Sequence, residues 1–435
     1  MNLLTYLLVY GAIIALSMLL YVRRKSRRNQ EAQRVRAESE RAGLNEPPSL
    51  HPVVDPTKCF GSGACTRACP EAALGVVNGK ATLINAAACI GHGACFSACP
   101  VQAITLVFGT AKRGVDIPHV SADYESNVPG VFIAGELGGM GLIRKTAEQG
   151  RQAMAAIRKR MGNHAAPLDV VIVGAGPAGI SAGLSAIHHK MRYAIVEQED
   201  SLGGAVYHYP RNKIAMTAPV KLDLIGTVKL GTEVQKEKLL AFWNDVMART
   251  GLQVRFNERF EGLDTRADGT FEVKTSKEVL HTRSVLLALG RRGSPRKLEV
   301  PGEETAKVVY RLIDAEQYAG QDVLVVGGGD SALEAAIALA EQPGTTVTLS
   351  YRSAAFSRVK EKNRLAVQAA EREGRLKLLL ESQVQEIRTD TVALTTKSGD
   401  LELANDHVIV CAGGVLPTPL LQSIGIRFET KHGKA

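Results

Sequence analysis

Apolar and polar positions divide the chain into stretches of different character. The first is an apolar run from Leu3 to Val22, twenty residues without a charged side chain. Residues 23–46 are polar and charged without an apolar stripe, which predicts a solvated helical stalk that ends near the prolines at 47–48. Beyond residue 109, short apolar runs alternate with helix-like segments and glycine-rich turns, a pattern typical of parallel α/β sheets.

The apolar run has the length of a membrane-spanning helix, because about 20 residues of α-helix cross the roughly 30 Å of bilayer hydrocarbon. Five basic side chains follow the run (Arg23, Arg24, Lys25, Arg27 and Arg28), whereas a cleaved signal peptide has its basic residues first. Basic flanks stay in the cytoplasm. We therefore expect an uncleaved single-pass anchor in the cytoplasmic membrane that contacts lipid through residues 3–22. Its N-terminus would lie outside and all later domains in the cytoplasm. The alternative is a buried helix of a soluble domain.

The net charge of +9 does not indicate nucleic-acid binding. Residues 23–36 hold seven Lys/Arg and one Glu, so +6 of the +9 lies beside the apolar run. The remainder of the chain is nearly balanced and has no basic stripe with interleaved aromatic residues. A length of 435 residues allows about three domains of roughly 150 residues each.

A repeat of cysteines follows the stalk. Six of the seven cysteines lie between positions 59 and 99, and in a cytoplasmic chain such a group indicates metal binding rather than disulfides. The stretch KCFGSGACTRACPEAAL recurs thirty residues later as ACIGHGACFSACPVQAI. Bacterial two-cluster ferredoxins use the motif C-x2-C-x2-C-x3-C-P, in which the fourth cysteine binds the other cluster. Residues 51–108 resemble these ferredoxins.

The resemblance implies two iron–sulfur clusters with interleaved ligands. One cluster takes Cys59, Cys65 and Cys99, and the other takes Cys69, Cys89 and Cys95. The second cysteine of each motif is replaced, by Ser62 in one copy and by His92 in the other. Three thiolates suffice for a 3Fe–4S cluster, whereas a 4Fe–4S cluster needs Ser62, His92 or water as its fourth ligand. A histidine ligand would raise the reduction potential. The alternative is a degenerate ferredoxin fold without metal.

Two glycine-rich turns predict two dinucleotide-binding domains. DVVIVGAGPAG (169–179) and DVLVVGGGDSA (322–332) each read as a buried strand that runs into a helix, whose N-terminus binds a pyrophosphate. The candidate cofactor-binding residues are Gly174, Gly176, Pro177, Ala178 and Gly179 in the first turn, and Gly327, Gly329, Asp330, Ser331 and Ala332 in the second.

The strand after each turn ends in a different charge. After the first turn it ends in Glu197, which is placed to bind ribose hydroxyls. After the second turn it ends in Arg352, with Arg358 and Lys360 beyond and no carboxylate. Basic side chains suit a 2′-phosphate, so we expect NADPH in preference to NADH. The alternative is that these arginines belong to a solvated loop.

These motifs, together with LGGAVYHYP (202–210), SVLLALG (284–290) and HVIVCAGGVLPTP (407–419), resemble those of thioredoxin-reductase-like flavoproteins. The resemblance implies that the first turn binds FAD and the second binds the nicotinamide nucleotide. It also places Gly203 and Gly204 next to the isoalloxazine ring.

One element of this family is displaced in the sequence. Family members end with a strand and helix that contact the flavin and read like NVPGVFIAGE, but here that segment stands at 126–157, ahead of the first turn. We infer a circular permutation, which can close if residues 110 and 435 lie near each other. The strand 131–134 would then join the sheet of 170–173, with Gly135 and Glu136 at the flavin and a helix from about Leu142 pointing its N-terminus there. Glu136 replaces the usual Asp. The alternative is that the segment completes a second protomer, which leaves a homodimer open.

Thiol–disulfide chemistry is disfavoured by the cysteine positions. Thioredoxin reductases carry a C-x2-C pair in the nucleotide domain, but no cysteine lies between Cys99 and Cys411. Bacillithiol-disulfide reductases place a reactive cysteine where Ala178 stands. Cys411 lies in an apolar strand, and we expect it to be an inert core residue. The remaining pattern is that of ferredoxin–NADP reductases.

The predicted fold is α/β, with two Rossmann-like dinucleotide-binding domains preceded by a small α+β ferredoxin module and an N-terminal transmembrane helix. We expect a transmembrane anchor at 1–22, a charged stalk at 23–50, a ferredoxin-like iron–sulfur domain at 51–108, the permuted last β–α part of the FAD domain at 109–165, the FAD-binding domain at 166–294, the NAD(P)-binding domain at 295–404 and a return to the FAD-binding domain at 405–435.

The predicted function is electron transfer between NAD(P)H, FAD and the clusters, to or from a membrane or soluble electron-transfer protein. No catalytic acid or base is expected, because the cofactors carry the chemistry. One alternative is a flavin-dependent reductase of a small molecule or disulfide, in which the ferredoxin module relays electrons. Another is a redox sensor without turnover.

Overall fold

The computed structural model describes residues 3–433, except positions 42–43, 45, 48–49, 90, 92, 112, 140, 161–165, 232, 292 and 357–358. At 3–9, 216 and 294 it describes the backbone without the side chain. The chain forms two compact units. One holds Met1–Gly114, Ala355–Arg364 and Lys431–Ala435, and the other holds Val115–Ala354 and Leu365–Thr430.

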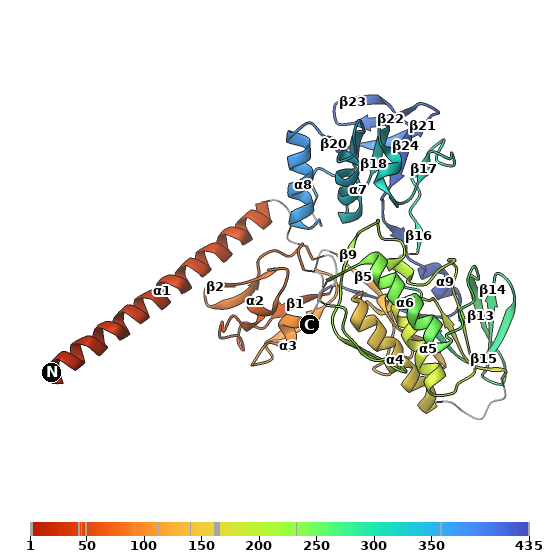
Figure 1. Ribbon diagram of the computed structural model, residues 1–435, viewed down its shortest axis with the longest axis horizontal. Coiled ribbons are helices and arrows are strands. Elements are labelled where there is room, and N and C mark those ends of the chain that lie inside the picture. Colours follow the sequence, from red (N-terminus) through yellow and green to blue (C-terminus); the bar gives the residue numbers. More distant parts are fainter. Residues whose placement is uncertain are drawn as a thin grey trace. The chain divides into compact units, whose positions relative to one another are not determined.

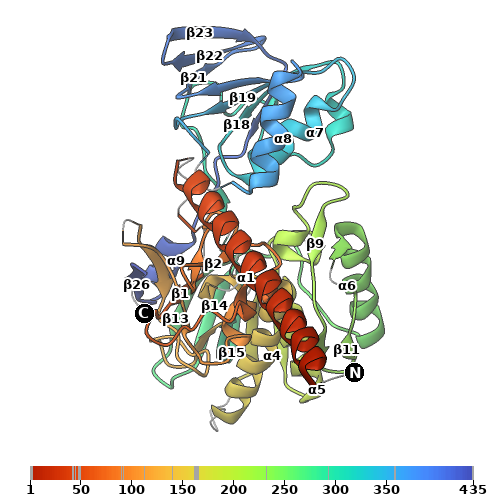
Figure 2. The same ribbon diagram turned by 90° about the vertical axis from the view of Figure 1, so that its left-hand side faces the viewer.

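The first unit begins with one continuous helix, α1 (Leu3–Arg41), shown in Figures 1 and 2. Residues 23–28 are exposed, as expected of a helical stalk, but farther along the helix carries a narrow packed face that the sequence analysis did not expect. Ala32 is buried against Val77 and Ile84 of the ferredoxin module, and the partly buried Val35 packs beside it. With Ser39, which is also buried, these residues form a narrow face at helical spacing. The helix ends at Arg41, before the expected boundary.

The expected membrane span begins among residues 3–9, whose side chains lie outside the described part of the chain. Among the residues that are described, no helix is both long enough and apolar enough to cross a bilayer.

The ferredoxin module repeats its fold as it repeats its sequence. Strand β1 (His51–Val54) pairs antiparallel with β4 (Ile104–Val107), and β2 (Leu74–Val77) pairs antiparallel with β3 (Lys80–Leu83). Two short helices, α2 (Ala64–Ala68) and α3 (Ala94–Ser97), each carry the second of the three cysteines of their copy, Cys65 and Cys95. Each helix starts at a left-handed glycine, Gly63 with φ 68° and Gly93 with φ 71°, which other residues adopt at a cost.

The second unit contains a six-stranded sheet in the order β13-β14-β15-β7-β8, with β6 also paired to β15. Its strands are β6 (Val131–Ile133), β7 (Leu168–Val173), β8 (Tyr193–Val196), β13 (Phe260–Thr265), β14 (Phe271–Thr275) and β15 (Val279–Leu287). The end of β15 lies between β6 and β7 and is parallel to both, with Val285 opposite Val131 and Val171. The displaced strand therefore lies in the sheet of its own chain, as expected from the permutation.

Two helices pack on each other and on this sheet, α4 (Ile143–Arg160) and α5 (Pro177–His188), as Figure 1 shows. Met154 of α4 and Ile180 of α5 are fully buried in one core with Ile172 of β7. The helix of the displaced segment thus covers the same sheet as α5, the helix that follows the first glycine-rich turn. Farther along the chain lie β9 (Ile214–Met216), β10 (Val220–Leu222), β11 (Gly226–Val228), β12 (Glu233–Gln235) and α6 (Lys236–Thr250).

The C-terminal segment returns to the start of the displaced segment. The Gly433 amide donates to the Phe108 carbonyl at 2.8 Å, and a Cβ on Gly109 would overlap the Lys431 carbonyl oxygen. Just beyond, β5 (Val115–Pro118) pairs with β26 (Phe428–Lys431). Residue 435 lies outside the described part of the chain, but residues 431–433 lie beside 108–109, which is the proximity that a circular permutation requires.

A second parallel sheet has the order β17-β24-β18-β19-β20. Its strands are β17 (Val308–Val309), β18 (Asp322–Val326), β19 (Thr346–Tyr351), β20 (Lys377–Leu380) and β24 (His407–Val410), accompanied by α7 (Asp330–Ala340) and α8 (Glu361–Arg372). A three-stranded antiparallel sheet of β21 (Gln383–Ile387), β22 (Thr391–Thr396) and β23 (Gly399–Ala404) precedes β24.

The predicted return to the FAD domain at residue 405 is wrong. Strand β24 pairs with β18 on one side and β17 on the other, so it belongs to the second sheet. Its apolar side chains are buried there. The return follows β25 (Gly414–Val415), which pairs with β16 (Ser294–Pro295). Beyond it, α9 (Thr418–Ser423) buries Leu421 in the core of the first sheet.

Candidate functional site

The first glycine-rich turn lies between β7 and α5 and depends on close backbone contacts. Gly174 has φ 105°, and a Cβ there would lie 2.6 Å from the Ala288 carbonyl oxygen. A Cβ on Gly179 would overlap the Gly174 carbonyl oxygen. Helix α5 starts at Pro177, so its free N–H groups face the turn. This arrangement fits the pyrophosphate of a dinucleotide.

Glu197, directly after β8, is hydrogen-bonded to the backbone of this turn. It is buried, and its carboxylate accepts hydrogen bonds from the Ala175 amide at 2.7 Å and the Glu199 amide at 3.1 Å. Burial raises the pKa of Glu197 above its ordinary value, although these amide donors oppose the shift. Because the pKa is raised, the carboxylate loses its charge at a higher pH than an exposed glutamate would.

Backbone contacts support Glu197 from behind. Its amide donates to the Arg255 carbonyl at 2.9 Å, and its carbonyl accepts from the Glu258 amide at 2.8 Å. The buried Glu258 carboxylate in turn accepts from the Thr275 hydroxyl at 2.7 Å.

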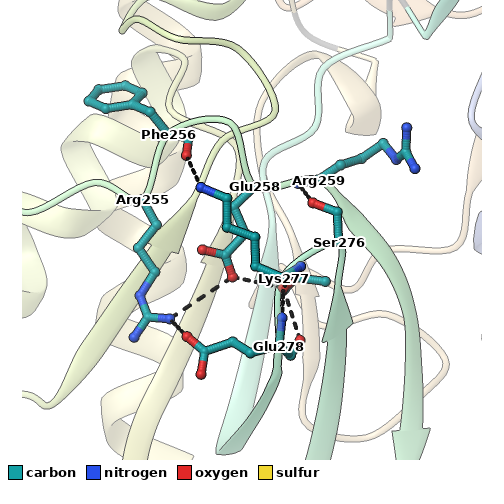
Figure 3. Close-up of polar contacts among 8 residues, drawn as sticks. Arg255, Phe256, Glu258, Arg259, Ser276, Lys277 and Glu278 are labelled. Atoms are coloured by element: carbon teal, nitrogen blue, oxygen red, sulfur yellow. Dashed lines mark hydrogen bonds and ion pairs between the residues drawn. The ribbon is translucent and has the colours of Figure 1, made fainter.

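Figure 3 shows how the turn between β14 and β15 is tied to the same segment. Arg255 pairs with Glu278, and Lys277 donates to the Phe256 carbonyl at 2.9 Å. Sequence reasoning missed this support, because its three segments are far apart in the chain and carry no motif.

The displaced segment meets the fingerprint turn at the carboxyl ends of β6 and β7. Gly135 has φ 86°, and a Cβ there would lie 3.2 Å from the Ala178 methyl. A Cβ on Gly150 of α4 would overlap the Ala178 carbonyl oxygen. On the other side, a Cβ on Gly204 would lie 3.1 Å from the Gly176 Cα. The structure therefore brings together the glycines that the sequence places near the flavin.

Glu136 faces the end of β15, where sequence reasoning missed Arg291. A Cβ on Gly290 would lie 4.0 Å from a Glu136 carboxylate oxygen. Arg291 donates to the Asp116 carbonyl at 3.3 Å. Burial lowers the pKa of the Arg291 guanidinium, while the charges of Glu136 and Asp116 oppose that shift. Arg291 directly follows the family motif SVLLALG, and this position could have identified it from the sequence.

The second glycine-rich turn joins β18 to α7. Gly327 has φ 148°, and the Cys411 carbonyl oxygen occupies the space that its Cβ would need. Asp330, Ser331 and Ala332 form the first turn of α7. The ring of Tyr351, another residue that the sequence did not single out, packs on the backbone of Gly328.

Two further residues at this turn were named from the sequence. Arg352 follows β19 and is exposed, whereas Arg358 lies outside the described residues.

The expectation that Cys411 is a core residue of a strand is wrong, because β24 ends at Val410 and Cys411 is only half-buried.

The cysteines of the ferredoxin module line two cavities. The first cavity, of about 310 Å³ including space open to solvent, is lined by Cys59, Cys65 and Cys99 with the exposed Ser62. The second, of about 360 Å³, is lined by Cys69, Cys89 and Cys95. These are the two groups expected from the ferredoxin repeat. His92 lies outside the described residues.

Amide donors around the cavities fit iron–sulfur clusters. The Ala81 amide donates to the Cys59 sulfur at 3.4 Å and the Ala103 amide to the Cys99 sulfur at 3.2 Å, and such bonds favour negatively charged sulfur. Burial raises the pKa of Cys95 to about 11, so its thiol has to release a proton when it binds iron.

Among the described residues, no three His, Cys, Asp or Glu side chains are grouped to hold a single metal ion. A cluster distributes its cysteine ligands over several irons, so its ligands need not meet around one point.

Two nucleotide-binding folds and a cysteine-lined module define a flavin- and nicotinamide-dependent oxidoreductase with a ferredoxin module. Comparison with known families agrees. Residues 171–434 match the family described as pyridine nucleotide-disulphide oxidoreductase, and residues 51–100 match a 4Fe-4S dicluster domain. The chain belongs to the pyridine nucleotide-disulphide oxidoreductase family.

Curated relatives include the bacilliredoxin reductase Bdr of Bacillus subtilis, which is 29% identical over 61% of this chain and 82% of the relative. A ferredoxin–NADP reductase of Pediococcus pentosaceus is 34% identical over 43% of this chain. That alignment spans 55% of the relative, about half of its length. Among solved structures, the bacillithiol disulfide reductase Bdr (YpdA) from Bacillus cereus has a TM-score of 0.54 and 25% identity, covering 60% of this chain and 82% of that one.

Proposed function

We propose that this protein is a membrane-anchored reductase that takes electrons from NADPH and passes them through FAD and two iron–sulfur clusters to an electron-transfer protein. The observation that carries the proposal is the combination of a pyridine nucleotide-disulphide oxidoreductase fold with a module that has two three-cysteine cavities. In addition, Ala178 stands where disulfide reductases of this kind have a reactive cysteine. When bound, FAD accepts an electron pair from the nicotinamide and releases single electrons, which iron–sulfur clusters can accept.

The residues of the chain bind and orient these groups. The N-terminus of α5 and the Glu197 carboxylate suit the pyrophosphate and ribose of FAD. The exposed Arg352 suits the 2′-phosphate of NADPH. The thiols around the two cavities suit the irons of the clusters.

The N-terminal part of α1 supports anchoring in the cytoplasmic membrane with the N-terminus outside. Between Tyr10 and Val22 the large apolar side chains of the helix are exposed, and the run of basic residues that starts at Arg23 follows directly. Deleting residues 1–28 should release a soluble protein that still binds FAD. The deletion spares Asn29, whose side chain accepts a hydrogen bond from the Asn78 amide of the ferredoxin module.

Anaerobic turnover tests the proposal. The purified protein should contain roughly 6–8 iron atoms, the range set by two 3Fe or two 4Fe clusters. NADPH should bleach the flavin and then the cluster absorption, and a one-electron dye should be reduced faster than any member of a panel of disulfides and quinones. A protein that carries flavin but no iron, or clusters that NADPH cannot reduce, would show that the proposal is wrong.

A second candidate is direct reduction of a disulfide at the flavin, which the named activity of the similar Bacillus cereus bacillithiol disulfide reductase favours. The same panel decides between the two. Rapid turnover of a disulfide that persists after iron is removed would favour this second candidate.

A further inference from the structure

The surface around the first cysteine cavity is apolar at its centre. Phe60 follows Cys59 directly, lines the cavity and is 62% exposed. Val101, close after Cys99, lines the same cavity and is 39% exposed. Exposed together at one cysteine-lined cavity, these two side chains offer an apolar contact surface to a partner.

Basic side chains lie beside this apolar centre and contact the loop that carries Cys59 and Ser62, although none is among the described lining residues of the cavity. The exposed Lys80 donates to the Cys59 carbonyl at 2.6 Å, and the exposed Arg67 donates to the Ser62 carbonyl at 3.3 Å. Lys58 precedes Cys59 with its side chain 62% exposed, and its ion pair with Asp55 is long, at 3.7 Å. The rim of the first cavity therefore carries positive charge.

The second cavity has a different rim. Glu71 is among its described lining residues, and Ala88 and Ser97 stand thirty residues after Lys58 and Arg67, at the positions where the first copy has basic side chains. Phe96 follows Cys95 and is 50% exposed, but it is not among the residues that line the cavity. The basic side chains are thus a feature of the first copy and not a general consequence of the repeat.

We propose that Lys58, Phe60, Arg67, Lys80 and Val101 form a docking surface for an acidic electron-carrier protein, and that electrons leave the chain through the first cavity. This inference rests on the proposed function. Weak electron-transfer complexes bury small interfaces, and an apolar centre with a charged rim is common in protein–protein contacts. Complementary charge steers the encounter and raises the association rate. The basic rim therefore selects a partner with an acidic face.

The electron balance of the step is simple. Oxidation of one NADPH to NADP⁺ releases two electrons and one proton. Each electron that leaves through the first cavity reduces one carrier by one electron, so one NADPH supports the reduction of two carriers.

The test uses the full-length protein, NADPH and an acidic flavodoxin as the probe, with a basic c-type cytochrome for comparison. At low salt, Lys58→Glu should slow reduction of the flavodoxin about tenfold, within the range of electrostatic steering, and salt should remove most of the difference. Reduction of the cytochrome should become faster. Phe60→Ser should slow flavodoxin reduction at every salt concentration, and Phe60→Leu should restore it, because Leu keeps the apolar contact.

Matched variants serve as controls. Phe96→Ser removes an exposed aromatic residue next to Cys95 that does not line a cavity, and Lys229→Glu reverses an exposed charge on the other unit. Both should reduce the flavodoxin at the wild-type rate. All variants should keep the wild-type iron content and the wild-type rate with a small neutral dye, which shows that the cofactors are intact.

The proposal is overturned if Lys58→Glu and Phe60→Ser reduce the flavodoxin at the wild-type rate, or if Phe96→Ser is equally impaired. It is also overturned if these variants lose binding to anionic lipid vesicles without any change toward flavodoxin, since the surface would then contact lipid. Flavodoxin binding to the oxidised protein, measured by calorimetry, separates the two hypotheses. Binding that depends on Lys58 in a protein whose clusters NADPH cannot reduce would refute the proposed function and retain the docking surface.

Discussion

At the scale of single residues, the cysteines around each cavity come from both copies of the repeat. Cys99 belongs to the second copy, yet it lines the first cavity with Cys59 and Cys65. We predict that Cys99→Ala and Cys65→Ala remove the same cluster, lowering the iron content by about half and leaving the same electron paramagnetic resonance signal. Cys69→Ala should remove the other signal, and Cys411→Ala should change neither. Different residual signals for the Cys99 and Cys65 variants would contradict the shared site.

Arg352 allows a second test at this scale. It is exposed directly after β19, the position from which a side chain reaches a ribose phosphate. Arg352→Ala should raise KM for NADPH about tenfold, equivalent to about 1.4 kcal/mol, and leave KM for NADH nearly unchanged. Lys397→Ala, which removes a side chain that is 77% exposed, serves as the control. Equal effects on both nucleotides would show that Arg352 does not contact the phosphate.

At the scale of elements, the contact between α4 and α5 is set by a glycine. Gly150→Ala supplies about 1 kcal/mol of helix propensity. Its methyl group would overlap the Ala178 carbonyl oxygen, which cannot move without shifting the fingerprint helix. We expect the clash to dominate, with a net loss of roughly 1–2 kcal/mol and earlier release of FAD on heating, followed by flavin fluorescence. Gly138→Ala meets no atom of the described, non-adjacent residues within 4 Å of the new methyl and should cost much less.

Helix α1 provides the other test at this scale, because its C-terminal part packs on the ferredoxin module. Ala32 is 5% exposed, and a Cβ on Gly75 of β2 would lie 2.8 Å from the Ala32 methyl. Ala32→Lys should detach this part of the helix at a cost of about 2–3 kcal/mol, seen as faster hydrogen exchange in β2. Gln30→Lys, at an exposed position of the same helix, should leave exchange unchanged. If both variants exchange alike, the packing does not stabilise the module.

At the scale of the whole molecule, the permuted order of the flavin-binding fold can be reversed. Gly433 contacts Phe108, so residues 166–435 followed by a short linker and residues 110–160 should place β6 beside β15 without strain. We predict that this variant folds, lacks the ferredoxin module and binds FAD in a 1:1 ratio. Residues 166–435 alone, which lack β6 and α4, should not retain FAD. Equal FAD binding by both variants would show that the displaced segment is dispensable.

Local chemistry explains what the sequence by itself determined about this protein. A phosphate-binding turn needs its glycines and its helix start within about ten contiguous residues, so 169–179 and 322–332 can be recognised without coordinates. Cysteine spacing likewise reveals a two-cluster module, because each ligand loop is short and occurs twice. The displaced strand was recognised by its resemblance to the family, which also implied that it joins the sheet of 170–173.

Only the tertiary structure decided which distant segments meet. The apolar strand 407–410 suits either parallel sheet by composition, and its pairing with β18 assigns it to the second one. Ala32 and Val35 are inconspicuous in a charged helix until β2 covers them. The support of Glu197 by Arg255 and Glu258 leaves no pattern in the sequence, because each contact joins segments far apart in the chain. Packing between elements depends on their arrangement in space, and local propensity does not encode it.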